Sequence, residues 1–249
     1  MCLLAIMNRV VADAPLVVGA NREESYARGG EPPRILDGPT RILCGTDPQA
    51  GGTWFGVNQH GVLAAITNRL KSALPTQPRS RGMLVRDLLA CASAADALNL
   101  ACRELSSNRY AGCNVVIADI HRVEVVQAGD WLRVRPLTPG IHVVTNHDVN
   151  SASDPRTRHA IDWLERHSFR TADECLLALA ELCGRTEPPP ICLRGDDRGT
   201  VSSTLLALAP TLLRGRFLHA QGPPDRTPFA DLSHLLRQLA PGKPLPIDH

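Results

Sequence analysis

Residues 1–10, MCLLAIMNRV, and residues 16–24, LVVGANREE, are the two stretches from which the fold is predicted. Each contains an apolar run without the alternation of a half-exposed strand, which indicates strands buried on both faces over residues 3–11 and 16–20. Residues 13–15, with an aspartate and a proline, provide a short turn between them. The chain is therefore expected to begin with two adjacent buried strands.

Cys2 directly follows the initiator methionine. Removal of Met1 by an aminopeptidase is favoured when the second residue is small, and it would leave a thiol and a free α-amine on one residue. The amine has a pKa of about 8, close to that of the thiol, so it can accept the thiol proton without a histidine. Taken alone, Cys2 is explained better as a small apolar residue that begins a strand.

Four consecutive polar residues, Asn21 to Glu24, follow the second apolar run. If the strand continues through them, two of the side chains point inward, where Arg22 and a carboxylate must satisfy each other. Such a pair would hold the amine of a nucleophile or a carboxylate of a substrate. A solvated strand exit explains the same residues equally well.

The rest of the chain alternates between groups of strands and pairs of helices. The segment 58–61 has hairpin turn chemistry, and the Gly- and Pro-rich segment 29–40 is expected to be a loop. Paired helices between groups of strands favour a layered α+β fold over a doubly wound parallel sheet. No repeat or linker indicates a second domain, so residues 1–249 are expected to form one. Further strands are predicted at 53–57, 62–67, 114–118, 122–127, 131–134, 142–144, 203–209 and 211–219, and helices at 83–92, 94–105, 155–165, 172–183 and 229–239.

Composition narrows the class of protein. The chain has 249 residues, of which 43% are hydrophobic, enough for a large core, and its net charge of +2 is spread without a basic block. A nucleic-acid partner is therefore not expected. No Cys-x-x-Cys pair occurs, so neither a zinc site nor another metal site is expected. Because Asn8 and Arg9 interrupt the first apolar run, neither a signal peptide nor membrane insertion is expected, and the protein is expected to be cytoplasmic.

Several motifs occur in an order that resembles one family. Met-Cys at the start and Ala20-Asn-Arg-Glu-Glu, where the family signature is Asn-Arg-Asp-Glu, are two of them. The others run to about residue 209: Gly51-Gly-Thr-Trp-Phe-Gly-Val, Gly61-Val-Leu-Ala-Ala-Ile-Thr-Asn, Arg79-Ser-Arg-Gly-Met-Leu-Val, Tyr110-Ala-Gly-Cys-Asn-Val-Val-Ile-Ala-Asp, Pro139-Gly-Ile-His-Val-Val-Thr-Asn and Gly199-Thr-Val-Ser-Ser-Thr-Leu-Leu-Ala-Leu. Together they resemble the NRDE family, which includes the transport-and-Golgi-organisation proteins.

That family in turn resembles the cysteine N-terminal-nucleophile hydrolases, typified by bile-salt hydrolases and penicillin V acylase. The resemblance implies a four-layer αββα sandwich, an α+β fold. It also places Cys2 as the nucleophile and Glu23 where those enzymes have an aspartate that contacts the α-amine. Asn68 matches an oxyanion-hole asparagine and Asn146 a second active-site asparagine, while Arg22 would position the amine or the substrate. Amide N–H donors aimed at a developing oxyanion each contribute about 2.7–4 kcal/mol.

Two positions depart from the pattern that the resemblance implies. Glu23 replaces the aspartate and is one methylene longer, and Val201 stands where family members often have an arginine. Arg198 or Arg22 would then have to supply the missing charge.

Two functions remain open at this point. The first is a hydrolase or acyltransferase that acts on a non-peptide amide bond of a small molecule, with no cofactor. The second is a non-catalytic protein on the same fold that binds or transports haem or acyl lipids. The sequence leaves the oligomeric state open, between a monomer and a homo-oligomer.

Overall fold

The computed structural model describes residues 2–241, which form two antiparallel β-sheets and five α-helices. The six-stranded sheet has the order β10 (Gly140–Val144), β1 (Leu3–Asn8), β2 (Leu16–Ser25), β11 (Arg198–Leu208), β12 (Arg216–Ala220) and β13 (Ala230–Asp231). The seven-stranded sheet has the order β3 (Glu31–Leu36), β4 (Ile42–Thr46), β5 (Phe55–Asn58), β6 (Leu63–Asn68), β7 (Cys113–Ala118), β8 (Val123–Ala128) and β9 (Leu132–Pro136).

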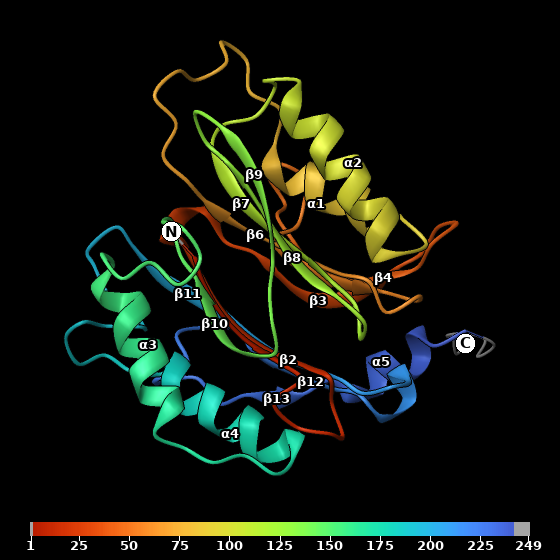
Figure 1. Ribbon diagram of the computed structural model, residues 1–249, viewed down its shortest axis with the longest axis vertical. Helices are drawn as coiled ribbons and strands as arrows, with labels where there is room; N and C mark the ends of the chain where they lie inside the picture. The colour runs from red at the N-terminus through yellow and green to blue at the C-terminus, as the bar shows by residue number, and fades with distance from the viewer. Residues whose placement is uncertain (1, 242–249) are drawn as a thin grey trace.

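The helices cover the outer faces of the two sheets (Figure 1). Helices α1 (Arg81–Leu89) and α2 (Ala94–Ser106) pack on the seven-stranded sheet, and α3 (Pro155–Glu165) and α4 (Ala172–Cys183) on the six-stranded sheet. One apolar core fills the space between the sheets, and a further core lies under each helix pair. The four-layer αββα sandwich is therefore confirmed. The last helix, α5 (Ser233–Leu239), packs at one end against β12, β3 and β4.

Strand β1 shows why the first apolar run does not alternate with polar residues. Leu4 and Ile6 belong to the core between the sheets, whereas Leu3, Ala5 and Met7 belong to the core under α3 and α4. A strand packed on both faces needs apolar side chains at every position. The run in residues 3–7 is thus explained by a strand inside a four-layer molecule.

The helices of the second pair lie where the sequence predicts them, and each begins with a capping residue. Asp154 accepts a hydrogen bond from the backbone N–H of Arg156, and Pro155 occupies the first turn of α3. Thr171 accepts in the same way from Glu174 at the start of α4. The predicted bounds of both helices agree with the structure.

The prediction of a loop over residues 29–40 is wrong for residues 31–36, which form a strand. This strand, β3, is an edge strand that pairs with β4 in a register that shifts between Glu31 and Arg34. Pro32 and Pro33 lie within that irregular part, and an edge strand tolerates proline because one row of its backbone groups has no partner strand. The proline signal that indicated a loop therefore belonged to an edge strand.

Within residues 2–241, none of the helices has both the length and the apolar character needed to cross a lipid bilayer.

Candidate active site

Strand β2 does not end after the apolar run but continues to Ser25. Its second half pairs with β11, with Arg22 opposite Ser202 and Glu23 opposite Thr200, and a register irregularity at Val201 between them. Asn21, Arg22 and Glu23 are all buried. The solvated strand exit is therefore wrong, and the polar residues belong to a strand in the interior.

Cys2 lies beside this polar half of β2. It directly precedes β1, whose first residue, Leu3, pairs with Asn21. Cys2, Arg22, Glu23 and Asn68 line one cavity of about 310 Å³, together with Trp54 and the segment before α1. Four of the five residues predicted from the sequence for the site therefore meet at one end of the sandwich.

The environment of the Cys2 thiol sets its protonation state. Burial raises the pKa of the thiol, and the negative charge of Glu23 adds to this rise. The backbone N–H of Glu23, which faces the sulfur, and the guanidinium of Arg22 oppose it. A thiol whose pKa is raised needs a nearby base before it can act as a nucleophile.

Arg22 points into the space between the sheets. Its guanidinium carbon lies 4.1 Å from the centroid of the Trp54 ring, and Nη1 donates a hydrogen bond of 2.5 Å to the carbonyl of Gly29. Burial lowers the pKa of this guanidinium, although nearby acidic groups oppose the effect. Among residues 2–241, no carboxylate forms an ion pair with Arg22. Its positive charge therefore faces the cavity without a carboxylate bound to it.

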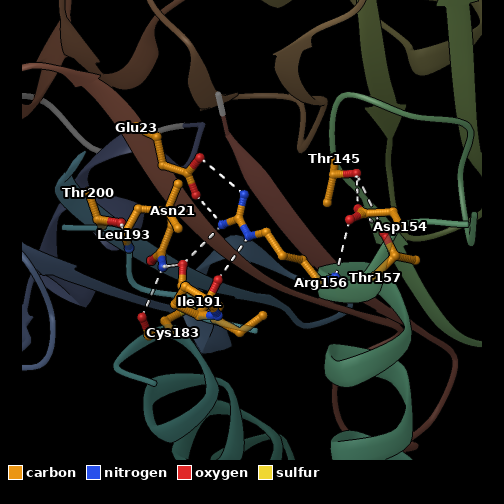
Figure 2. A network of polar contacts seen from close by, with 11 residues as sticks. Asn21, Glu23, Thr145, Asp154, Arg156, Thr157, Cys183, Ile191, Leu193 and Thr200 are labelled. Atoms are coloured by element: carbon orange, nitrogen blue, oxygen red, sulfur yellow. Dashed lines mark hydrogen bonds and ion pairs between the residues drawn. The ribbon is translucent and has the colours of Figure 1, made fainter. Parts of the chain in front are cut away.

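Glu23 points to the opposite face of the sheet, toward α3 (Figure 2). Its carboxylate forms an ion pair with Arg156, with 3.3 Å between Nη1 and Oε2 for the longer hydrogen bond. Arg156 also donates to the carbonyls of Pro190 and Ile191, at 2.9 and 3.1 Å. Burial raises the pKa of Glu23, and the positive charge of Arg156 opposes the rise.

Asn21 supports the backbone around this pair. Its Nδ2 donates to the carbonyls of Cys183 and Ile191, at 2.9 and 3.1 Å, which connects β2 to the end of α4 (Figure 2). Asn21 and Arg156 thus bind the same carbonyl of Ile191.

The two predicted asparagines occupy different surroundings. Asn68 ends β6, is exposed, and lines both the Cys2 cavity and a neighbouring cavity of about 580 Å³. Asn146 is half-buried in the bend after β10 and lines the neighbouring cavity, not the one that contains Cys2. Both remain predicted oxyanion donors; Asn68 alone of the two shares a cavity with Cys2.

The bend that carries Asn146 is fixed from two sides. The Thr67 hydroxyl donates 2.6 Å to the carbonyl of Thr145, and Asn114 Nδ2 donates 2.9 Å to the carbonyls of Thr145 and His147. From the other side, the Thr145 hydroxyl donates 2.6 Å to Asp154, the N-cap of α3 (Figure 2). The backbone around Asn146 is therefore bound to the seven-stranded sheet, through β6 and β7, and to the helix layer, through α3.

That Arg22 or Arg198 supplies the charge absent at Val201 stays a prediction. Arg22 and Val201 line a further cavity together, whereas Arg198 is exposed and its Nη2 lies 3.9 Å from Oε1 of Glu24.

The sequence does not predict Arg156 as a partner of Glu23. Its only sequence signal is its place after the cap Asp154-Pro155, because a contact across 133 residues leaves no local pattern.

The family of this chain follows from its match to a known family, described as Transport and Golgi organisation 2, over residues 1–191. The chain belongs to this family. Human and mouse Transport and Golgi organisation 2 homologues are each 32% identical to it over 140 residues, which is 53% of this chain and 50% of theirs. The chain therefore spans about half the length of the curated relatives it matches. The expectation of one domain over residues 1–249 remains a prediction.

Several solved structures with the same fold are N-terminal-nucleophile hydrolases. A Caenorhabditis elegans N-acylethanolamine-hydrolyzing acid amidase ortholog superposes with a TM-score of 0.59 at 18% identity, covering 83% of this chain and 92% of its own. Penicillin V acylase from Agrobacterium tumefaciens superposes with a TM-score of 0.57 at 12% identity, covering 97% and 88%. A C2A mutant of conjugated bile acid hydrolase from Clostridium perfringens gives 0.53 at 12% identity, over 94% and 93%. At these identities the likeness establishes the fold.

Proposed function

We propose that this protein cleaves or transfers the acyl group of a non-peptide amide of a small molecule, with Cys2 as an N-terminal nucleophile. The observation that carries the proposal is the position of Cys2, directly before β1, in one cavity with Arg22, Glu23 and Asn68. Met1 lies outside the described residues, and the proposal requires its removal in the mature protein.

In the first step, the α-amine of Cys2 takes the proton from the thiol, and the sulfur forms a bond to the carbonyl carbon of the amide. Negative charge develops on the former carbonyl oxygen. The side-chain amide of Asn68 and the guanidinium of Arg22 line the same cavity and would donate hydrogen bonds to that oxygen. The C–N bond then breaks, and the α-ammonium returns its proton to the leaving amine. A thioester on Cys2 remains.

In the second step, the α-amine takes a proton from water or from the hydroxyl of another acyl acceptor. The oxygen of that water or hydroxyl attacks the thioester carbon. The C–S bond breaks, the acyl group leaves on the acceptor, and the proton returns to the thiolate. Glu23 would hold the α-amine through its carboxylate, because Glu23 and Cys2 line the same cavity. Asn146, from the neighbouring cavity, would contact the substrate or the oxyanion once a substrate is bound.

The test begins with the intact mass of the purified protein, which reports whether Met1 is removed. The processed protein is then treated with p-nitrophenyl acetate, an activated acyl donor, and the N-terminal peptide is analysed by mass spectrometry. We expect one acetyl group on Cys2, none in Cys2→Ala, and a stable oxygen ester or none in Cys2→Ser. Cys91→Ala is a matched control that removes another half-buried thiol and should leave acetylation unchanged.

Retention of Met1 in the cellular protein would contradict the proposal, because the α-amine would then belong to another residue. Equal acetylation of the Cys2→Ala variant would place the nucleophile elsewhere. A processed protein that is never acetylated at Cys2 would favour a binding function on this fold, with haem or acyl lipids as the ligands to test.

A further inference from the structure

The first turn of α3 connects to both sides of the candidate site (Figure 2). Asp154, its N-cap, accepts from the hydroxyls of Thr145 and Thr157, at 2.6 and 2.7 Å, and so holds the bend next to Asn146. Two residues later, Arg156 crosses to Glu23 on β2. One rigid helical turn thus fixes two predicted site residues that are far apart in the sequence.

Arg156 has the geometry of a group that orients a carboxylate. It contacts both oxygens of Glu23 through its two terminal nitrogens, so that the carboxylate plane is fixed as well as its position. Arg156 also donates to the carbonyls of Pro190 and Ile191, which prevents the guanidinium from swinging away. The side chains of Arg156 and Glu23 are only 14% and 3% exposed, so solvent does little to loosen the pair.

We propose that Arg156 is the positioning residue of this site, acting on Cys2 through Glu23. It fixes the carboxylate of Glu23, a residue that lines the same cavity as Cys2, and balances its charge. A role of Arg156 in catalysis rests on the proposed function. Its effect on the reactivity of the Cys2 sulfur can be measured without that function.

The charge balance around Glu23 has a measurable consequence. Arg156 and Arg198 are charged groups near Glu23, and Glu23 and Arg22 act on the thiol of Cys2. Arg156 supplies the positive charge that pairs with the Glu23 carboxylate. Removal of Arg156 therefore leaves an unbalanced negative charge near the sulfur, which disfavours the thiolate.

The experiment is a double-mutant cycle on the full chain, read by alkylation of Cys2 with iodoacetamide between pH 6 and pH 10. Site-specific labelling is followed by mass spectrometry of the N-terminal peptide. We expect Arg156→Met to slow labelling at pH 7.5 by about threefold to tenfold and to move the midpoint to higher pH. In the Glu23→Gln background the same substitution should change the rate by less than about twofold, because no carboxylate remains to be unbalanced.

Arg158→Met is the matched control, because Arg158 lies on the same helix and is exposed. Arg156→Lys keeps the charge and should restore most of the labelling rate, which provides a second variant if Arg156→Met does not fold. Equal slowing by Arg156→Met in the wild-type and Glu23→Gln backgrounds would mean that Arg156 acts only by holding residues 190–191. Unchanged labelling in Arg156→Met would show that Arg156 does not act on Cys2. Either result overturns the inference.

Iodoacetamide reports the thiolate whether or not the protein turns over an amide. A protein that is never acetylated but shows the coupling would therefore retain this inference and lose the proposed function. The opposite pair of results, acetylation without coupling, would retain the function and assign the positioning of Cys2 to other residues.

Discussion

Arg22 and Glu23 are neighbours on β2, yet their side chains meet different layers. The even-numbered position faces the space between the sheets, where Arg22 stacks on Trp54, and the odd-numbered position faces the helices, where Glu23 meets Arg156. The additional methylene of Glu23, relative to an aspartate, extends its carboxylate toward Arg156. One dipeptide thus connects three layers of the sandwich around Cys2.

The stack of Arg22 on Trp54 provides the prediction at this scale. Arg22→Lys should lower the free energy of unfolding by about 1–2 kcal/mol, because a lysine keeps the charge but loses the planar stack and the directed bond to Gly29. Urea unfolding measures the change. Arg34→Lys, at an exposed position, should stay within about 0.5 kcal/mol of wild type. If Arg22→Lys costs as much in a Trp54→Leu background, the stack is not the cause.

At the scale of the element, the first turn of α3 is stabilised by a buried carboxylate. Burial favours the neutral form of Asp154, but hydrogen bonds from Thr145, Thr157 and the backbone of Arg156 outweigh it, so the pKa of Asp154 lies below its ordinary value. A carboxyl group whose pKa is lowered in the folded state contributes stability above its unfolded pKa of about 3.9. That contribution is lost as the pH falls through the folded pKa.

Asp154→Ala should therefore lower the free energy of unfolding by about 2 kcal/mol at pH 7. The difference from wild type should remain constant above about pH 5 and shrink below about pH 4, where the wild-type carboxylate becomes protonated. Urea unfolding at a series of pH values measures this. Thr171→Ala removes the N-cap of α4, an uncharged acceptor for the backbone N–H of Glu174, and should cost stability without the acid dependence. A loss that is equally large at pH 3 would assign the role of Asp154 to packing.

At the scale of the whole molecule, the candidate site and the contacts of Arg41 with α5 lie at opposite ends of the sandwich. The site is formed where β2, β6 and β10 end, whereas Arg41, directly before β4, reaches the last carbonyls of α5. The last carbonyls of a helix have no partners within it, and here one guanidinium binds three of them. The chain's last helix is thus fastened to the sheet on the other side of the core.

Arg41→Ala should lower the free energy of unfolding by about 1–3 kcal/mol, because it leaves these carbonyls without their donor. Hydrogen exchange should accelerate in α5 while the pH dependence of Cys2 alkylation stays unchanged, since the two ends lie on opposite sides of the core. Arg34→Ala, which removes an exposed ion pair with Glu31, is the control and should cost less than about 1 kcal/mol. Unchanged exchange in α5 would show that packing alone holds the helix.

The layered fold, the second helix pair and four residues of the cavity that contains Cys2 are all predicted from the sequence. Apolar runs without alternation require strands covered on both faces, and capping residues fix helix ends, so both are local signals. The ordered motifs placed Cys2, Arg22, Glu23 and Asn68, which the structure brings together.

The partners of those residues follow from the packing of distant segments and are not predicted from the sequence. The pairing of Glu23 with Arg156, the stack of Arg22 on Trp54 and the place of Asn146 in a neighbouring cavity all depend on how two sheets and a helix meet in space. The edge strand β3 likewise depends on pairing with β4, which its prolines concealed. Contacts between distant segments are fixed by packing and register, and neither leaves a periodic signal in the chain.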